Sequence, residues 1–109
     1  MNWIPLSTED QLKSLIDQSK QKPQVIFKHS TRCSISSVAK ARLEKSTRPE
    51  HLDFYYLDLL SYRTISDAIA RQFQVVHESP QILVIKNGHC IYHESHMGID
   101  MQEMLSALN

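Results

Sequence analysis

The chain has 109 residues, a length that predicts one domain, residues 1–109, built around one hydrophobic core. Twelve Lys and Arg residues balance twelve Asp and Glu residues, so the formal net charge is zero. A general binder of nucleic acid or of anionic membranes would show an excess of basic residues, and we expect neither partner. There are two glycines, Gly88 and Gly98, which excludes the Gly-rich loops that cradle phosphate groups.

The two cysteines, Cys33 and Cys90, are too few for the disulfide framework of a small secreted protein. Residues 1–11 contain neither a basic cluster nor an apolar stretch of signal-peptide length. The longest strongly apolar run, residues 82–85, is far shorter than a membrane span. We therefore expect a cytoplasmic protein with reduced thiols, in which a cysteine is assessed first for its reactivity.

The start of the chain predicts a strand and a helix. Trp3 and Ile4 are compatible with a short leading strand, and residues 8–11 have the form of a capping box that begins a helix. That helix should end by Lys20, because the ring of Pro23 disfavours helical geometry in the residue before it.

A polar turn and a cysteine join the next predicted strand to the next predicted helix. Gln24–His29 contains a short apolar run, which is typical of a strand buried on both faces. The turn at residues 30–32 and Cys33 follow, and Ser34–Lys45 has the pattern of a helix. The residues that we expect to face the core from this helix are Ile35, Val38, Ala39 and Leu43.

The second half of the chain predicts a strand, a helix and a hairpin. Residues 53–60 are rich in aromatic and aliphatic side chains and indicate another buried strand. A helix should follow, with an apolar stripe formed by Tyr62, Ile65, Ile69 and Phe73. Gln81–Lys86 predicts a strand, Asn87-Gly88 is a strong signal for a two-residue hairpin loop, and residues 89–94 should return antiparallel.

A last helix completes the predicted fold. Asp100 and Glu103 form a second capping pair, and Ile99 and Met104 occupy the positions of a hydrophobic staple. The apolar stripe of this helix is Met101, Met104, Leu105 and Leu108. The order is therefore βαβαβαββα, in which the strand–helix alternation implies parallel strands and the hairpin adds an antiparallel edge. The predicted fold class is α/β, with a central mixed sheet flanked by helices.

Cys33 stands where a buried strand meets the start of a helix. Its sulfur would face the free N–H groups of the first helical turn and the positive end of the helix dipole, and Arg32 precedes it. These features favour the thiolate, which is the reactive form of cysteine. Short hydroxyl side chains around it suit a turn that solvent can reach: Ser30, Thr31, Ser34, Ser36 and Ser37. We therefore interpret Cys33 as a reactive thiol rather than an inert buried one.

The order of motifs resembles that of thioredoxins, in which a strand, a Cys-X-X-Cys or Cys-X-X-Ser turn and a helix precede a proline that opens the strand of a terminal hairpin. Here these parts are Cys33-Ser34-Ile35-Ser36, Ser79-Pro80 and Asn87-Gly88. The segment Ser-Thr-Arg-Cys-Ser-Ile-Ser at residues 30–36 is more narrowly similar to the signature of the monothiol bacilliredoxins, the small proteins of the bacillithiol redox system. The resemblance covers nearly the whole chain.

The resemblance implies a thioredoxin-like fold and a thiol–disulfide oxidoreductase. In the implied reaction the Cys33 thiolate attacks the disulfide between a protein cysteine and bacillithiol, and a second thiol, free bacillithiol, then regenerates Cys33. The implied partners are S-bacillithiolated proteins and bacillithiol as co-substrate, with no bound cofactor and no metal. Pro80 is implied to be cis and to face Cys33, leaving the backbone of Ser79 to pair with an extended substrate. The residues expected to bind the substrate are Thr31, Arg32, Ser34, Ser36, Ser79 and Pro80.

Three side chains near Cys33 have more than one interpretation. Ser36 stands where a dithiol thioredoxin has its resolving cysteine and cannot form a disulfide, so an adduct on Cys33 must wait for another thiol. Its hydroxyl either hydrogen-bonds the Cys33 thiolate or bonds only backbone or water. Arg32 could attract the carboxylates of the malate group of bacillithiol. Lys28 could do the same, but the alternation of strand residues favours ordinary surface solvation for it.

Cys90 belongs to the hairpin, where a two-residue loop predicts four cross-strand levels: Lys86–His89, Ile85–Cys90, Ile82–His93 and Ser79–His96. Cys90 then lies about five strand residues, on the order of 16 Å, from the active-site end, whereas a disulfide needs Cα atoms within roughly 7 Å. Strand alternation puts His89 and His93 on one face and Cys90 on the other, so these residues do not converge on a metal. His96, level with Ser79, is a candidate to assist proton transfer near Cys33.

Two functions of other classes remain open. Monothiol glutaredoxins with a Cys-Gly-Phe-Ser turn bridge a [2Fe–2S] cluster between subunits, but the Cys-Ser-Ile-Ser turn here lacks the glycine that lets a cluster approach the backbone. The chain could also be a thioredoxin-fold binding module without turnover. It has no Trp directly before Cys33 and no acidic residue in the strand before it, which argues against general reduction of protein disulfides.

Overall fold

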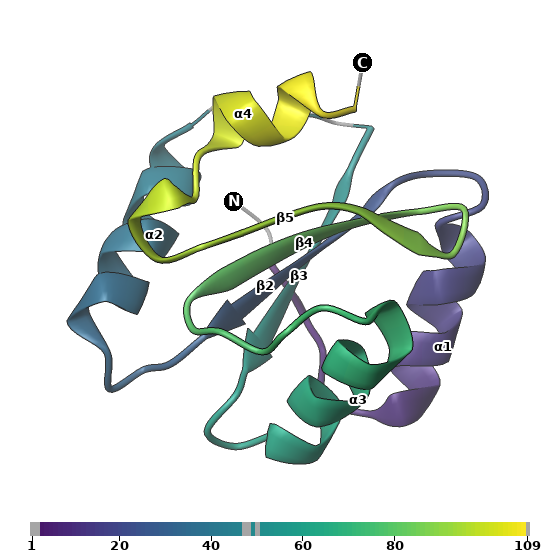
Figure 1. Ribbon diagram of the computed structural model, residues 1–109, viewed down its shortest axis with the longest axis horizontal. Coiled ribbons are helices and arrows are strands. Elements are labelled where there is room, and N and C mark those ends of the chain that lie inside the picture. Colours follow the sequence, from purple (N-terminus) through teal and green to yellow (C-terminus); the bar gives the residue numbers. More distant parts are fainter. Residues whose placement is uncertain (1–2, 47–48, 50, 109) are drawn as a thin grey trace.

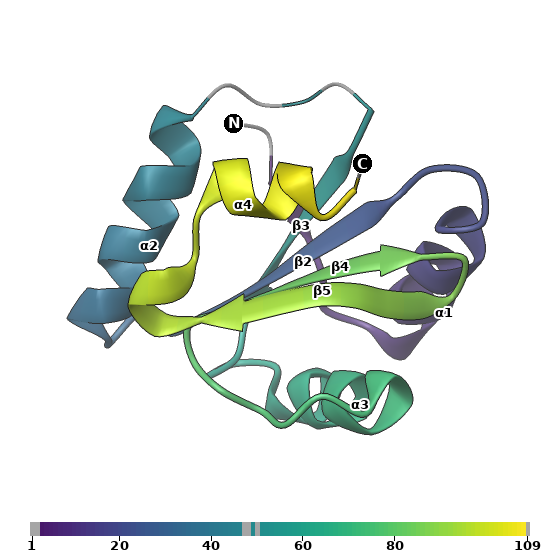
Figure 2. The ribbon, with the colours of Figure 1, turned by 45° about the horizontal axis from the view of Figure 1, so that its top comes forward.

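The computed structural model describes residues 3–46, 49 and 51–108, which form a mixed five-stranded sheet with helices on both faces (Figure 1, Figure 2). In chain order the elements are β1 (Ile4–Pro5), α1 (Glu9–Gln18), β2 (Gln24–His29), α2 (Ser34–Lys45), β3 (Asp53–Asp58), α3 (Arg63–Phe73), β4 (Gln81–Lys86), β5 (His89–Ser95), the 3-10 turn η1 (His96–Gly98) and α4 (Met101–Ser106). The predicted order βαβαβαββα and the α/β class are confirmed. The predicted domain, 1–109, also includes six residues that lie outside the described ones: 1, 2, 47, 48, 50 and 109. Among the described helices, none combines the length and the apolar character that a membrane crossing requires.

The strand order in the sheet is β1-β3-β2-β4-β5. β1, β3 and β2 run parallel, β4 runs antiparallel to β2, and β5 returns antiparallel to β4. Consequently β2, β3 and β5 end, and β4 begins, at one end of the sheet (Figure 2). We call it the Cys33 end, because Cys33 follows β2 there. The opposite end carries the turn between β4 and β5 and is called the hairpin end.

Each face of the sheet is covered by its own apolar cluster. α1 and α3 pack on one face through Leu12, Leu15, Ile65, Ile69 and Phe73. α2 and α4 pack on the other face through Ala39, Leu43, Met101 and Met104. Fully burying one such aliphatic side chain contributes about 1.5–3 kcal/mol, so these clusters are the main source of stability. Because β2 lies in the middle of the sheet between both clusters, all its residues are buried, which confirms that its apolar run is buried on both faces.

Local hydrogen bonds begin α1 and α4 where the sequence predicts. Thr8 Oγ1 accepts from the N–H of Gln11 at 3.1 Å, and Gln11 Oε1 accepts from the N–H of Thr8 at 3.1 Å, so the capping box is confirmed. Asp100 Oδ1 accepts from the N–H of Glu103 at 3.1 Å. These side chains satisfy backbone donors that a helix leaves free at its N-terminus.

The core-facing side of α2 differs from the prediction. Ile35 and Val38 were expected to face the core, but they are 44% and 46% exposed. The buried stripe consists instead of Ser36, Ala39 and Leu43, which are spaced by three and four residues. The apolar pattern gave the wrong residues because the polar side chain of Ser36 forms hydrogen bonds inside the protein and can therefore be buried. Ala39 and Leu43 face the core as predicted, whereas Ser36 takes the place expected for Ile35 and Val38.

The start of α3 is also displaced from the predicted apolar stripe. Tyr62 is the N-cap residue and is 41% exposed, while Ser66 completes the buried stripe. β3 ends at Asp58 rather than at residue 60, because the Asp58 carboxylate accepts from the N–H of Leu60 at 3.2 Å. The carbonyl of Asp58 accepts from the N–H of Tyr62 at 3.0 Å. These hydrogen bonds turn the chain out of the sheet before the aromatic and aliphatic run ends.

The turn of the hairpin is the one predicted. Asn87 (φ 53°) and Gly88 (φ 78°) both adopt the left-handed conformation that a two-residue loop of this type requires. The N–H of Asn87 donates to the carbonyl of Ser19 at 2.8 Å, and the N–H of Gly88 donates to Ser19 Oγ at 2.9 Å. The first two predicted pairs, Lys86–His89 and Ile85–Cys90, are confirmed.

Beyond Cys90 the hairpin departs from the predicted register. A β-bulge at the Val84/Ile85 step shifts the later pairs, which are Val84–Tyr92, Leu83–His93, Ile82–Glu94 and Gln81–Ser95. The predicted levels Ile82–His93 and Ser79–His96 are therefore wrong by one residue. The N–H of His96 donates to the carbonyl of Pro80 at 2.9 Å instead. A bulge adds one unpaired residue to one strand, and the alternating pattern of the sequence carries no mark of it.

Candidate active site

Cys33 is the N-cap residue of α2 and is half-buried at the Cys33 end of the sheet. Its N–H donates to the carbonyl of Ser30 at 3.1 Å, and its own carbonyl accepts from the N–H of Ser37 at 3.1 Å. The side chain makes no capping hydrogen bond, and the first turn of α2 contains no acidic residue. The thiol group therefore lies at the N-terminus of α2, the positive end of the helix dipole.

Ser36 lies three residues after Cys33 and is fully buried. Its Oγ accepts from the N–H of Ser30 at 3.0 Å and lies 2.6 Å from Nδ1 of His29. Burial, and secondarily the charge of Lys40, lowers the pKa of His29. The Ser36 hydroxyl is thus engaged by His29 and Ser30. Neither sequence interpretation of Ser36 included the His29 side chain.

His29 is a member of the site that sequence reasoning missed. Its ring lies 5.8 Å from that of Phe27 and 5.4 Å from that of Tyr56, and Trp3 stacks on Phe27 at 5.5 Å. This aromatic packing fixes the imidazole at the end of β2, directly before the turn that leads to Cys33. No partner of His29 could be read from sequence spacing, because Ser36 is brought to it only by the packing of α2 on the sheet.

The segment 74–80, between α3 and β4, closes the site from the side of β4. Lys28 pairs with Gln81, so Pro80 lies level with His29, the last residue of β2. Figure 1 and Figure 2 both show the end of this segment beside the end of β2. The Ser79–Pro80 peptide bond is cis, as the resemblance implies. Pro80 is buried, and the buried Oγ of Ser79 has no hydrogen-bond partner among the described residues.

The other predicted binding residues lie on the turn itself, and Lys28 does not. Thr31, Arg32 and Ser34 are exposed around Cys33. Lys28 was expected at the surface, but it is fully buried on the face of the sheet covered by α1 and α3. Its Nζ lies 3.3 Å from Nδ1 of His77, and burial lowers the pKa of Lys28 to about 8. Alternation failed as a guide because a central strand has no solvent-facing side, so Lys28 cannot attract an anion at the surface.

Cys90 lies at the hairpin end, as predicted. It pairs with Ile85, which pairs with Gln24 at the start of β2, whereas Cys33 follows the end of β2. The Cys90 thiol donates to the carbonyl of Tyr92 at 3.3 Å, and burial raises the pKa of Cys90. Both cysteines are free. The length of β2 separates them, so Cys90 is not placed to resolve an adduct on Cys33.

The bulge also changes the faces of the hairpin histidines. His93 pairs with Leu83 and Cys90 with Ile85, two residues of the same apolar cluster, so Cys90 and His93 share a face that His89 does not. Within the described part of the chain, no three His, Cys, Asp or Glu side chains are grouped to hold a metal ion. His96 (φ 55°) is exposed and bonds Pro80 through its backbone, so it lies at the Cys33 end.

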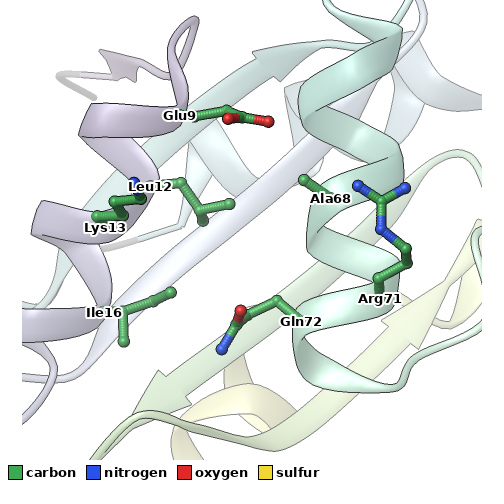
Figure 3. Close-up of a pocket in the computed structure, with 7 residues that line it drawn as sticks. All are labelled: Glu9, Leu12, Lys13, Ile16, Ala68, Arg71 and Gln72. Carbon is green, nitrogen blue, oxygen red and sulfur yellow. The ribbon is translucent and has the colours of Figure 1, made fainter.

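A pocket of about 310 Å³ lies between α1 and α3 (Figure 3). Leu12, Ile16 and Ala68 line it together with charged side chains at its rim, among them Glu9 and Arg71. It opens on the face of the sheet that α1 and α3 cover, whereas Cys33 begins a helix on the other face. This pocket is therefore not part of the Cys33 site.

Comparison with known proteins gives one matching family and several solved structures of similar fold. The family described as monothiol bacilliredoxin BrxC matches residues 4–104. A solved structure described as a candidate oxidoreductase with a thioredoxin fold is similar, with 33% sequence identity, a TM-score of 0.85, and coverage of 97% of this chain and 93% of that one. Thioredoxin from Malassezia sympodialis has 22% identity and a TM-score of 0.76, over 98% of this chain and 88% of that one. Thioredoxin from Fasciola hepatica has 16% identity and a TM-score of 0.76, over 96% and 95% of the two chains. The fold is a thioredoxin fold.

Proposed function

The chain belongs to the monothiol bacilliredoxin family, and on that premise we propose that it is a thiol–disulfide oxidoreductase that removes bacillithiol from protein cysteines through Cys33. The observation that carries this proposal is the position of Cys33, half-buried at the N-cap of α2 with no second thiol at its end of the described structure. A half-buried thiol at the start of a helix is accessible to a disulfide, and thiol–disulfide exchange proceeds by attack of the thiolate.

The proposed reaction has two exchanges, and each one conserves the number of disulfides. In the first, the Cys33 thiolate attacks the bacillithiol sulfur of the mixed disulfide. A bond forms between that sulfur and Cys33, and the protein cysteine leaves as a thiolate. In the second, the thiolate of a free bacillithiol attacks the adduct. Cys33 leaves as a thiolate, and bacillithiol disulfide is released.

The surroundings of Cys33 support a one-cysteine route. Ser36, at the position of a resolving cysteine, has no thiol and is engaged by His29 and Ser30. Cys90 lies at the other end of β2. An adduct on Cys33 therefore has no internal thiol to displace it, and regeneration requires an external one.

The exposed surface next to Cys33 supports a substrate that is part bacillithiol and part protein. Arg32 is exposed beside the thiol and offers a positive charge to the carboxylates of the malate group. Two apolar side chains are exposed at the Cys33 end: Ile35 (44%) at the start of α2 and Met97 (58%) in η1, a turn that packs against α2. Clustered apolar side chains at a surface are typical of protein docking sites. In this proposal Thr31, Ser34, Ser79 and Pro80 line the route of the substrate between these segments.

The test is mass spectrometry after mixing the protein with bacillithiol disulfide. We expect one bacillithiol adduct, located on Cys33 by peptide mapping, absent from Cys33→Ser and retained by the matched control Cys90→Ser. A protein that carries a mixed disulfide with bacillithiol should then lose that group when it is incubated with the parent protein. A parent protein that stays unmodified in the first assay would contradict the proposal. Iron and brown colour after anaerobic reconstitution would favour the cluster-binding alternative.

A further inference from the structure

Lys28 is a buried titratable group that the proposed exchange does not use. It lies in the middle of the sheet on β2, and its side chain is fully buried. Asp67 on α3 attracts its charge, but the two form no ion pair among the described contacts. An ammonium group in such a place is costly unless hydrogen bonds compensate for the lost water. Its one hydrogen-bond partner in the described part of the chain is Nδ1 of His77, at 3.3 Å.

Nδ1 of His77 is contacted by two donors, Lys28 on β2 and Ser66 on α3. Ser66 Oγ on α3 also lies 3.3 Å from Nδ1 of His77. An ammonium group has only donors, so Nδ1 accepts and the ring carries its hydrogen on Nε2. Burial, followed by the charges of Lys28 and Arg63, lowers the pKa of His77, which is consistent with a neutral ring. His77 is therefore held as a neutral acceptor by a charged donor.

His77 lies at the centre of the segment 74–80, where Val75 is buried in the apolar cluster of α1 and α3 and the Glu78 carboxylate accepts from Oγ of Ser95. The N–H of Val75 donates to Ala70 at 3.2 Å, and the carbonyl of Val76 accepts from Nε2 of Gln81 at 3.0 Å. At its end, the carbonyl of Pro80 accepts from the N–H of a residue in η1. The side chain of His77 adds polar links from the middle of this segment to Lys28 on β2 and Ser66 on α3. Directly beside it, Val76 is 83% exposed, an apolar side chain presented on an anchored backbone.

We propose that Lys28, acting through His77, is a positioning residue that holds the segment 74–80 where the protein half of the substrate disulfide docks. The segment carries Val76 and Ser79 and ends beside the turn that leads to Cys33. An apolar side chain of the same length would fill the space of Lys28 without the cost of burying a charge. The particular contribution of the ammonium group is therefore its hydrogen bond to His77. This inference rests on the proposed exchange at Cys33.

The variants Lys28→Met, His77→Phe and the double variant test the inference. Two reactions are compared: removal of bacillithiol from a bacillithiolated protein, and alkylation of Cys33 by iodoacetamide, which needs no docking. We expect each single variant to raise the KM for the protein substrate roughly tenfold, because a hydrogen bond to a charged group is lost, while kcat changes little. The double variant should be no worse than either single one, because the two residues act as one unit. The rate of Cys33 alkylation should stay within about twofold of the parent rate.

The control is Lys86→Met, the same substitution at an exposed lysine at the hairpin end of β4, which should keep the parent KM. Where Lys28→Met fails to fold, Ser66→Ala weakens the same acceptor and should raise KM in the same direction. A folded Lys28→Met with the parent KM, or single-variant effects that simply add in the double variant, would overturn the positioning role. A parent protein that removes no bacillithiol would instead overturn the proposed function, and this inference with it.

Discussion

The two cysteines of this chain occupy opposite ends of β2 and opposite chemical environments. Cys33 caps a helix, is half-buried, and is surrounded by exposed hydroxyl side chains on a polar turn. Cys90 lies in β5, packs against the apolar cluster of α1 and α3, and donates its thiol hydrogen to the carbonyl of Tyr92. Burial raises the pKa of Cys90, which favours the unreactive thiol. Neither thiol has the other as a partner.

The contrast shows that position decides what a cysteine does here. The sheet places the thiol of Cys33 where a helix begins and where several exposed segments meet, whereas the thiol of Cys90 replaces a small apolar residue in packing. The monothiol character of the proposed site follows from the same arrangement. The position next to Cys33 from which a thiol would resolve an adduct is occupied by Ser36, whose hydroxyl forms no disulfide.

The largest expected effect comes from giving Cys33 a neighbouring thiol. Residues three apart on a helix are neighbours, so Ser36→Cys puts a thiol within reach of Cys33. After treatment with bacillithiol disulfide, the introduced thiol should expel the adduct ~10³-fold or more faster than millimolar external thiol does, because the attack is intramolecular. Mass spectrometry should show a protein that has lost the mass of a hydrogen molecule. The parent protein is the control, because its second thiol, Cys90, lies at the hairpin end and should leave the adduct in place; an adduct that persists on Ser36→Cys would contradict the geometry.

The second prediction compares the rates at which the two cysteines are alkylated. Limited iodoacetamide at pH 7 should modify Cys33 to completion while Cys90 stays largely unmodified, because burial keeps Cys90 protonated and covered. Raising the pH should narrow the gap as Cys90 ionises. Peptide mapping of the single variants Cys33→Ser and Cys90→Ser reports each thiol separately. Equal labelling rates at pH 7 would mean that the two environments do not differ in the way described here.

Sequence patterns were sufficient where local chemistry sets the structure. Gln24–His29, Ser34–Lys45 and Gln81–Lys86 begin and end where they were predicted to, because a buried strand, a polar turn and a two-residue loop each have strong local signals. The same local signals placed Cys33 at the start of a helix. The resemblance to bacilliredoxins supplied the cis bond at Pro80, which no local pattern indicates.

Patterns failed where a polar residue is satisfied by a distant partner. The sequence patterns placed Ser36 and Lys28 at the surface, yet both are fully buried. Ser36 bonds His29 and Lys28 bonds His77, and only the tertiary structure brings these partners together. Hydrophobic periodicity therefore placed Ala39 and Leu43 in the core correctly but assigned Ile35 and Val38 there wrongly, since both are exposed. These errors gather at the Cys33 end of the sheet. Such conflicts between local pattern and tertiary structure are expected at functional sites.

The third prediction concerns the burial of Lys28, which should make the free energy of unfolding depend on pH in the alkaline range. Burial lowers its pKa from 10.5 to about 8, so between these pH values the unfolded chain binds a proton that the folded protein does not. The stability of the parent relative to Lys28→Met should therefore rise by up to about 3 kcal/mol as the pH increases from 8 to 10.5. Below pH 8 the ammonium is charged in both states, and the difference should be constant.

The measurement is urea unfolding of the parent and Lys28→Met across this range. Buried groups with raised pKa values oppose the trend, but they are present in both proteins and cancel in the difference: Tyr55, Tyr56, Cys90 and Tyr92. The exposed Lys86→Met should show no such rise. A difference between parent and Lys28→Met that does not change with pH would mean that Lys28 is hydrated rather than buried.

The smallest expected effect concerns the hydrogen bonds that hold α2 in its orientation on the sheet. Ser36→Ala removes the group that bonds Nδ1 of His29 and the N–H of Ser30, and both would be left unsatisfied in a buried place. The free energy of unfolding should fall by about 2 kcal/mol, the usual cost of such orphaned groups, measured by urea unfolding at pH 7. Ser37→Ala, one residue on and exposed, should change it by less than about 0.5 kcal/mol. If the two variants were equally stable, Ser36 would not set the orientation of α2. The exposure of Ile35 beside Cys33 would then depend on the packing of Ala39 and Leu43 alone, and the Cys33 end would be held together in the same way as the apolar surroundings of Cys90.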